Sequence, residues 1–396
     1  MDCAATLSCL EALGVAIEHD DNVLVISGIG INGLREPQAP LDCGNSGTTM
    51  RLFAGILAGQ DFKSTLTGDD SLRRRPMQRI IEPLEMMGAR ISADEGHAPL
   101  LIQGHRGLNP ITYELLVASA QVKSCILLAG LNANGRTEVI ENQITRDHTE
   151  RMLRSFGVQT ETGEAERKGE NARFAAVKGP ARLAARQVSI PGDISSAAYF
   201  LAAARLLPES SLEIDGIGLN PTRTLFLKHL QALGLDVEIA DAHEDNNEPV
   251  GEIRAQGSRT QLSGAAEPTL TIRGLVVPQL IDELPLLAVV GSQVQGGIEI
   301  RDATELRVKE SDRIAATALN LRAMGADVEE FDDGLRVAGP TRLRGAKIDP
   351  LGDHRIAMAF TVAGLVAEGE TEITDSECVA VSFPEFFDLL ESVVER

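Results

Sequence analysis

Residues 324–339 read MGADVEEFDDGLRVAG, and the pattern of this stretch recurs along the whole chain. Met324-Gly325 is typical of a helix end, because glycine adopts the left-handed backbone of a C-cap without steric cost. A polar turn and a short run ending in Gly339 follow, which indicates a strand hairpin. The same apolar-Gly helix end, followed by a run that ends in Gly, is found at Leu13-Gly14, Met87-Gly88, Phe156-Gly157 and Leu233-Gly234.

A second kind of helix, apolar on nearly all sides, is predicted between successive hairpins. Helices of this composition lie inside a domain rather than on its surface. Each is followed by a short strand such as Ile298–Ile300. The predicted inner helices are Thr48–Leu57, Gln121–Leu131, Ser195–Leu207, Glu283–Val294 and Ile356–Val366. Buried helices wrapped by mixed sheets indicate an α+β fold class, with a cleft between domains as the place for a ligand.

The repeat count predicts two domains, 1–188 and 189–396, with the boundary just before Ser189-Ile190-Pro191. The outer helices number six, ending with Phe386–Val394, whereas the inner helices number five. We therefore expect the first repeat to be incomplete. Roughly 40 residues before Met1, the length of one structural repeat, would complete two domains of three repeats each.

Composition narrows the function classes. A net charge of −21 argues against nonspecific nucleic-acid binding, which needs a basic face. The five cysteines are widely spaced without a metal-ligand pattern, which favours a reducing cytoplasm. We see no signal peptide and no run of 18 apolar residues, so no membrane partner is expected. Motifs for metals and for dinucleotides are also missing from the sequence, so no cofactor is predicted.

The segment RVKESDR, residues 307–313, has the composition of an anion site. It lies between a predicted strand and a predicted helix, where backbone N–H groups and the helix dipole favour an anion. If the helix begins by Lys309, then Lys309 and Arg313 share one face. Glu310 would then place an acid or base beside that cationic face. Asp282 and Glu283, at the start of an inner helix, are the other carboxylates well placed for proton transfer.

Ordinary helix capping is the alternative at both places. Ser311 and Asp312 would be the caps of a solvated helix start. Asp282 would likewise be the plain N-cap of its inner helix.

Cations at the starts of inner helices favour ligand binding. Arg51, Lys123 and Arg355 lie within about the first turn, where a cation opposes the helix dipole. We infer that an anion compensates them. Basic residues also recur in the loops before the outer helices, at Arg75, Arg146, Arg223 and Lys309. An acidic protein would then hold a strongly positive pocket.

The chain resembles the 5-enolpyruvylshikimate-3-phosphate (EPSP) synthase family. The motifs that carry the resemblance, in family order, are Asn45–Arg51, Arg75-Pro76, Ser119-Ala120-Gln121, Thr145–Thr149, Asn220–Arg223, Arg307–Arg313, Asp353-His354-Arg355 and Ser382-Phe383-Pro384. They span essentially the whole chain, and Ser119–Ser124 with Thr145–Thr149 is similar to the bacterial branch called class II. The resemblance implies an inside-out α/β barrel of two domains built from βαβαββ repeats.

The resemblance also implies a reaction. It is transfer of the enolpyruvyl group from phosphoenolpyruvate to the 5-hydroxyl of shikimate 3-phosphate, with release of phosphate, in the shikimate pathway of chorismate and aromatic amino-acid biosynthesis. Domain 1–188 would lie on the shikimate-phosphate side, and the family's N-terminal segment would complete domain 189–396. A cytoplasmic monomer without cofactor is expected, whose partners are the two small-molecule substrates.

Residue roles follow from the same resemblance. For shikimate 3-phosphate the implied residues are Ser119, Ala120, Gln121 and Arg146. For phosphoenolpyruvate they are Gly47, Arg75, Arg313 and Arg355, and Asn45 is a further substrate-binding residue. Asp282 would take the hydroxyl proton, Lys309 would hold hydroxyl and carboxylate oxygens, and Glu310 would help protonate the methylene carbon.

The sequence departs from the family at three places. A Lys-Ser-x-Ser-x-Arg stretch that begins the family's first inner helix is not present, and we expect an N-terminally truncated chain. Val381 occupies the position of a lysine that many members carry, and Glu305 stands where several members have Asn.

Three other functions remain open from the sequence. The sister enzyme that transfers enolpyruvyl to a UDP-amino sugar shares the fold, but its loop before Arg-Pro carries a cysteine, and residues 68–76 contain none. A DNA-encircling clamp would need basic inner helices, and these are apolar. A truncated relative that only binds shikimate 3-phosphate is the third.

Overall fold

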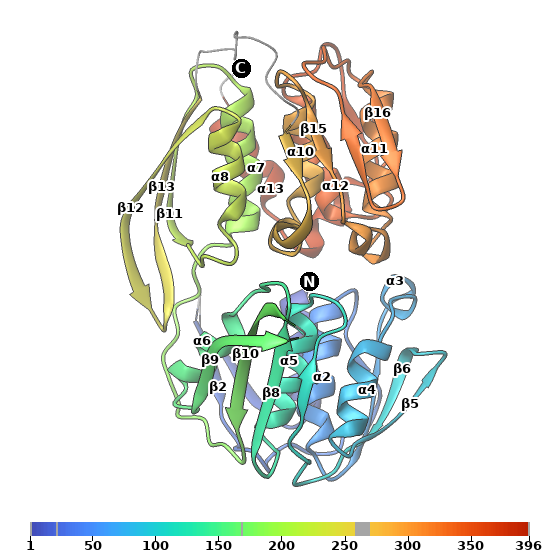
Figure 1. Ribbon diagram of the computed structural model, residues 1–396, viewed down its shortest axis with the longest axis vertical. Coiled ribbons are helices and arrows are strands. Elements are labelled where there is room, and N and C mark those ends of the chain that lie inside the picture. The colour runs from blue at the N-terminus through green and yellow to red at the C-terminus, as the bar shows by residue number, and fades with distance from the viewer. Residues whose placement is uncertain (1, 21–22, 168, 258–269, 395–396) are drawn as a thin grey trace. The chain divides into compact units, whose positions relative to one another are not determined.

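The chain folds into two compact units, Met1–Val188 and Ser189–Arg396 (Figure 1). The computed structural model describes residues 2–20, 23–167, 169–257 and 270–394. Both units are built from repeats of helices and small sheets.

The first unit contains six helices and ten strands among its described residues. In order they are α1 (Asp2–Ala12), β1 (Ala16–Asp20), β2 (Val23–Ser27), β3 (Leu41–Asp42), α2 (Gly47–Ala58), β4 (Lys63–Thr67), α3 (Asp70–Arg73), α4 (Gln78–Met86), β5 (Arg90–Asp94), β6 (His97–Gln103), β7 (Thr112–Glu114), α5 (Ala120–Gly130), β8 (Arg136–Glu141), α6 (His148–Ser155), β9 (Thr160–Arg167) and β10 (Glu170–Lys178).

The second unit continues with nine strands, seven α-helices and three short 3₁₀ turns in the described ranges. They are α7 (Ile194–Leu206), β11 (Ser211–Gly218), α8 (Leu225–Ala232), β12 (Leu235–Asp245), β13 (Glu248–Gly257), β14 (Leu270–Ile272), η1 (Gly274–Val276), α9 (Val277–Leu280), α10 (Leu284–Gly291), β15 (Ile298–Ile300), η2 (Thr304–Val308), α11 (Arg313–Ala323), β16 (Val328–Phe331), β17 (Gly334–Val337), β18 (Lys347–Ile348), α12 (His354–Gly364), β19 (Glu372–Ile373), η3 (Ser376–Val381) and α13 (Phe386–Val393).

The glycines predicted to end the outer helices do so. All five residues after these helices adopt left-handed backbone: φ is 90° at Gly14, 107° at Gly88, 84° at Gly157, 93° at Gly234 and 91° at Gly325. A β-carbon would be strained at such a φ, so glycine is required there. Each of these five outer helices therefore stops where the chain turns back into a hairpin, as the sequence pattern predicted.

Three of the sheets share one strand order, in which two parallel strands precede an antiparallel hairpin. These sheets are β3-β4-β6-β5, β7-β8-β10-β9 and β14-β15-β17-β16. In each of them the parallel pair flanks an inner helix, for example β7 and β8 around α5. A parallel pair needs such a crossover, which carries the helix across one face of its sheet. The N-termini of α2 and α5 thus follow within a few residues of a short strand, whereas η1 and α9 lie between β14 and α10.

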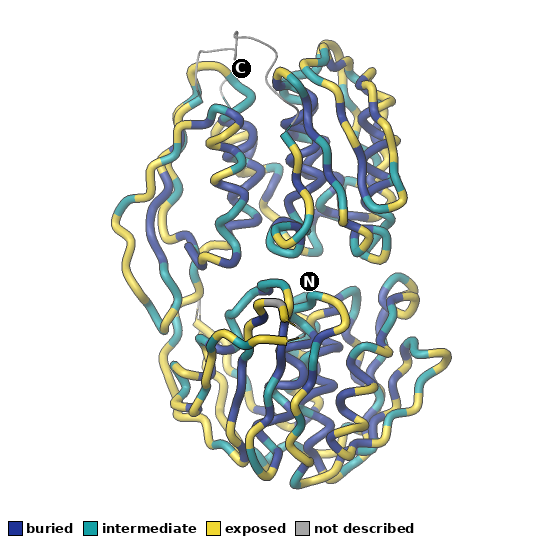
Figure 2. Tube along the Cα trace, viewed as in Figure 1, coloured by how far each residue is buried: buried dark blue, intermediate teal, exposed yellow. Residues whose placement is uncertain are grey.

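The inner helices form the cores of both units, as predicted. Helices α2 and α5 contact each other in the first unit, and α7, α10 and α12 contact one another in the second. Every residue of α10 is buried. Gly55 allows the close approach of α2 to α5, because a β-carbon there would lie 2.2 Å from the carbonyl oxygen of Cys125. Figure 2 shows the inner helices as the most continuously buried segments of each unit.

Among the described residues, no single helix is both long and apolar enough to cross a membrane. The segments Gly274–Leu280 and Leu284–Gly291 reach that length and composition only as a pair, and they are bent by 105° relative to each other. Because α10 is buried throughout, its hydrophobicity serves the core.

Candidate active site

In the first unit, polar side chains gather around the N-terminus of α2. The Arg75 guanidinium donates to Asn45 Oδ1 at 2.8 Å, and the amide nitrogen of Asn45 donates to Asp69 Oδ2 at 2.6 Å. From inside the helix, Arg51 donates to Gln121 Oε1 at 2.5 Å. Arg75 and Arg51 are both buried, at 7% and 8% exposure, so each guanidinium is held in one orientation. The structure thus brings together Asn45, Arg75 and Gln121, three of the predicted binding residues.

Gly47 lies where the two guanidinium groups converge. A β-carbon at this residue would lie 2.8 Å from Arg51 Nη1 and 3.1 Å from Arg75 Nη1. Both cations therefore approach the first helical residue of α2, against the positive end of the helix dipole. Such an arrangement favours an anion above Gly47, and a planar carboxylate or a phosphate matches guanidinium donors.

We expect the Gly47→Ala substitution to raise KM for an anionic substrate at least tenfold with little loss of stability. The new methyl group would displace the ends of Arg51 and Arg75, which are flexible, rather than any backbone. Because alanine is a better helix former than glycine, the midpoint of thermal unfolding should change little. Steady-state kinetics with thermal unfolding checks this, with Gly364→Ala at the end of α12 in the second unit as the control.

The N-terminus of α5 holds three further predicted residues. Ser119 is the N-cap, its hydroxyl accepting from Val122 N at 3.4 Å, and Ala120 is the first helical residue. The amide of Gln121 donates to Thr48 Oγ1 at 2.7 Å, which joins this helix start to that of α2. Arg146 lies in the loop between β8 and α6. These positions are as predicted, and their contact with a substrate stays a prediction.

The prediction that a bound anion compensates Lys123 is wrong. Its ammonium lies 2.8 Å from Glu150 Oε1 and 3.1 Å from Glu141 Oε2, so protein carboxylates compensate it. The physical reason is tertiary: Glu141 and Glu150 come from other elements, and the sequence pattern around Lys123 does not show them.

In the second unit, Arg313 is the centre of a network of charges. Its guanidinium lies 2.6 Å from Glu310 Oε2, 2.8 Å from Asp353 Oδ2 and 3.2 Å from Asp282 Oδ1. The side chain is only 1% exposed. Burial by itself lowers the pKa of Arg313, but the three carboxylates outweigh burial and raise the pKa above its ordinary value. The structure thus joins four of the predicted site residues, since Arg355 lies 3.6 Å from the second oxygen of Asp282.

The start of α11 differs from the expectation that Lys309 and Arg313 share a helical face. The helix begins at Arg313, and Lys309 follows the 3₁₀ turn η2 in extended backbone. Asp312 is the N-cap, because its carboxylate accepts from Ala315 N at 3.0 Å. The capping alternative is therefore confirmed for Asp312, whereas the Ser311 hydroxyl donates to Asp353 Oδ2 at 3.1 Å instead.

Asp282 is not the N-cap that the alternative assigned to it. The N-cap position of α10 is Glu283, which makes no side-chain capping bond. The Asp282 carboxylate points instead at Arg313 and Arg355, one oxygen to each. Two cations on one carboxylate favour its ionised form, which is the form that accepts a proton.

Lys309 has an altered pKa. Burial lowers the pKa of its ammonium, and the nearby carboxylate of Asp282 opposes that effect only in part. A lysine in this state loses its proton more readily than one in water. The group is thus suited to hydrogen bonding and proton exchange beside Asp282.

His354 is buried in the same region, and burial lowers its pKa to about 4, with the Arg355 charge adding to the effect. Because the unfolded chain binds this proton and the folded chain does not, stability should fall as pH drops from about 6.5 to about 4. We expect His354→Gln to remove this loss of stability, which is on the order of 3 kcal/mol at most between the two pH values. Denaturant unfolding at a series of pH values measures it, with exposed His105 substituted in the same way as the control.

A second group of polar residues, from the starts of α7 and α10 and from the loop before α8, lies beside this network. The Ser195 hydroxyl donates to the Glu283 carboxylate, and Arg223 donates both to Ser195 Oγ and, at 3.0 Å, to Asp193 Oδ1. Arg223 was expected to face an anion, and Asp193, the N-cap of α7, is one such partner. Glu283 was expected, together with Asp282, to be well placed for proton transfer, and that role stays a prediction; in the structure its carboxylate accepts from Ser195.

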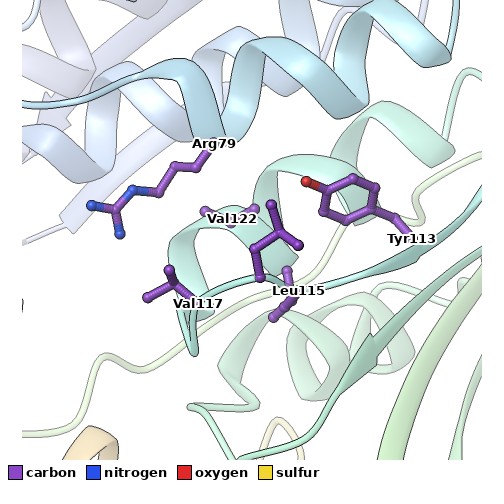
Figure 3. Close-up of a pocket in the computed structure, with 6 residues that line it drawn as sticks. Arg79, Tyr113, Leu115, Val117 and Val122 are labelled. Atoms are coloured by element: carbon purple, nitrogen blue, oxygen red, sulfur yellow. The ribbon is translucent and has the colours of Figure 1, made fainter. Parts of the chain in front are cut away.

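Two other features are not candidates for the active site. The hollow in Figure 3 encloses about 20 Å³, room for one or two waters, and Arg79, Tyr113, Leu115, Leu116, Val117 and Val122 line it. Glu213, Asp215 and Glu252 lie close enough to hold a cation, but the Arg254 guanidinium pairs with Glu252 and lies 3.7 Å from Glu213.

The class of protein is defined first by the fold. The chain is similar in structure to the enolpyruvyl transferase NikO from Streptomyces tendae, with a TM-score of 0.74 over 98% of this chain and 86% of that one. Identity to it is 18%, so this likeness concerns the fold alone.

The family follows from closer relatives. The family model for EPSP synthase (3-phosphoshikimate 1-carboxyvinyltransferase) matches residues 1–390. A 3-phosphoshikimate 1-carboxyvinyltransferase from Koribacter versatilis is 52% identical over 100% of this chain and 89% of its own length, and one from Salinibacter ruber is 50% identical over 99% and 88%. The solved EPSP synthase from Acinetobacter baumannii is 40% identical, with a TM-score of 0.81 over 98% of this chain and 87% of that one. The chain belongs to the EPSP synthase family.

Membership confirms the resemblance and the enzyme class, a carboxyvinyltransferase, together with the inside-out α/β fold of two domains. It also decides against the sister UDP-amino-sugar enzyme and the DNA clamp.

Proposed function

We propose that the chain transfers the enolpyruvyl group of phosphoenolpyruvate to the 5-hydroxyl of shikimate 3-phosphate, with release of phosphate. The observation that carries the assignment of residues is Asp282, a carboxylate between two guanidinium groups and beside a lysine of lowered pKa. Membership of the 3-phosphoshikimate 1-carboxyvinyltransferase family supports 3-phosphoshikimate as the substrate.

The first unit would hold shikimate 3-phosphate. Ser119, Ala120 and Gln121 surround the N-terminus of α5, where free backbone N–H groups favour a phosphate. Arg146 would add a cation for the phosphate, because Lys123 in the first turn of α5 is paired with Glu141 and Glu150. Asn45, Gly47 and Arg75 would contact phosphoenolpyruvate from the start of α2, where the cations Arg51 and Arg75 converge.

The second unit would supply the acid and base. Asp282 takes the proton of the 5-hydroxyl while that oxygen forms a bond to C2 of phosphoenolpyruvate. Glu310, fixed by Arg313 at 2.6 Å, delivers a proton to the methylene carbon, which becomes a methyl group. The resulting tetrahedral intermediate expels phosphate and loses a methyl proton, which restores the double bond. Arg313, Arg355 and Lys309 stabilise the negative charge on phosphate and carboxylate throughout.

We also propose a cytoplasmic monomer that acts on small molecules and not on nucleic acid or a membrane. The five cysteines are free, as a reducing compartment requires. Charge supports the exclusion of nucleic acid, since the chain carries −21.

The decisive experiment is phosphate release in the presence of both substrates and of each alone. We expect release only with both, and its loss in the Lys309→Met variant with unfolding unchanged within about 1 kcal/mol. Binding of shikimate 3-phosphate without turnover would instead favour the alternative of a relative that only binds it. Undiminished turnover in Lys309→Met would contradict the assignment of that lysine.

A further inference from the structure

A buried charge cluster in the first unit takes no direct part in the proposed chemistry. Lys123, in the first turn of α5, is 1% exposed and bridges Glu141 at the end of β8 to Glu150 in the first turn of α6. The two carboxylates are also buried. One ammonium thus ties together three separate elements.

Stability alone does not explain this cluster. Moving one cation and two carboxylates out of water costs several kcal/mol per ion, and well-packed apolar side chains often stabilise a core as much. Burial raises the pKa of Glu141 even though Lys123 opposes the shift, so this carboxylate is held at a cost. The cluster does fix the relative positions of the three elements, because each hydrogen bond holds one element against another.

The element it fixes is the loop that carries Arg146. Glu141 Oε2 accepts from the Thr145 hydroxyl at 2.6 Å and from its backbone N–H at 3.3 Å. Thr145 is buried and directly precedes Arg146 in the chain. The backbone next to Arg146 is therefore held by the carboxylate that Lys123 holds.

The far end of the loop is tied to the same helix. Glu150 joins α6 to the Lys123 ammonium at 2.8 Å, and the Thr149 and Ser124 hydroxyls share a hydrogen bond of 2.6 Å. The loop between β8 and α6 is thus fixed at both ends to the first turn and a half of α5. That turn begins with Ser119, Ala120 and Gln121.

We propose that Lys123 is a positioning residue for shikimate 3-phosphate binding, which sets Arg146 at a fixed distance from the N-terminus of α5. The inference rests on the proposed function, in which Arg146 and the start of α5 grip one phosphorylated substrate. The ammonium of Lys123 bonds to Glu141 and Glu150. A misplacement of about 1 Å in a substrate-positioning group can lower the reaction rate up to about 100-fold. A change at Lys123 that moves Arg146 should therefore have a large effect on the site.

The test is the Lys123→Met variant of the full chain, with shikimate 3-phosphate binding measured by calorimetry and with steady-state kinetics. We expect Kd and KM for shikimate 3-phosphate to rise at least tenfold, and KM for phosphoenolpyruvate to stay within twofold. Lys123→Arg, which keeps a donor for both carboxylates, should recover part of the affinity.

Leu127→Ala, one turn further along α5 and fully buried, is the matched control. It should lower the thermal midpoint without changing the affinity for shikimate 3-phosphate. If Lys123→Met is folded and binds within twofold of the parent, or only as weakly as Leu127→Ala, the inference is overturned.

Thr145→Val keeps the experiment decisive should Lys123→Met not fold. It removes only the hydroxyl donated to Glu141, and we expect a three- to tenfold weaker Kd, with an unchanged Kd contradicting the inference. Arg146→Ala separates the two proposals. If Arg146→Ala binds shikimate 3-phosphate normally, the proposed role of Arg146 in the site is refuted. If Arg146→Ala binds weakly while the Lys123 and Thr145 variants bind normally, only the positioning role of Lys123 is refuted.

Discussion

The Arg313→Ala variant is expected to lose measurable turnover and to unfold about 3–5 kcal/mol more easily than the parent, the range for breaking a buried ion pair. Without the guanidinium, Asp282, Glu310 and Asp353 would face one another around an empty space. The remaining carboxylates would then repel one another, and the base and acid of the reaction would lose their orientation. Phosphate release and denaturant unfolding measure the two effects.

The pH dependence of the stability of Arg313→Ala identifies the cause of its expected loss of stability. Carboxylates that have lost their cation have raised pKa values in the folded state, and stability from such groups is lost as pH rises. The stability deficit of Arg313→Ala should therefore be smaller near pH 5 than near pH 8. A deficit that is equal at both values would show that lost packing, and not charge, is responsible.

Arg322→Ala is the matched control on the same helix. The Arg322 side chain is 48% exposed and lies 3.7 Å from Glu330, a distance and exposure at which an ion pair contributes little. Its guanidinium also donates to the Val328 carbonyl at 2.9 Å, so we expect unchanged turnover and a loss of stability of about 1 kcal/mol. A loss of turnover in this variant would mean that any perturbation of α11 inactivates the protein.

The Asp282→Asn variant should lower kcat by about 10²–10⁴, the usual contribution of a general base. Asparagine keeps the shape of the side chain and one acceptor oxygen, so folding should be retained. It cannot take a proton, and Arg313 and Arg355 would each lose part of an ionic partner. Single-turnover kinetics with both substrates gives the change in the chemical step.

Asp327→Asn, at an exposed position after α11, is the corresponding control and should turn over normally. If Asp282→Asn retained more than a tenth of the parental kcat, another group would have to be the base. Glu310 would then be the first residue to test, because it also contacts Arg313.

Much of the fold was predictable because its signals are local. A glycine after an apolar residue marks a helix end through its own backbone, and all five such glycines have positive φ. Helix α10 consists almost entirely of apolar residues, which by itself requires burial, and it is buried throughout. Neither inference needed knowledge of distant residues.

The candidate site was predictable only in part. The charges of residues 307–313 could be read, but not the place where α11 begins, since Asp312 and not Lys309 provides the cap. For Lys123 the sequence indicated a cation that needs an anion, and the anion turned out to be protein carboxylates. Residue type was visible in each case, and the partner was not.

By itself, then, the sequence determined the repeats, the inner and outer helices and the family, because these depend on residue order and periodicity. Only the tertiary structure decided which charges meet. Asp282, Arg313 and Asp353 are separated by tens of residues, and their contacts arise only when α10, α11 and α12 pack together. Electrostatic energy depends on distance in space, and distance along the chain does not fix it.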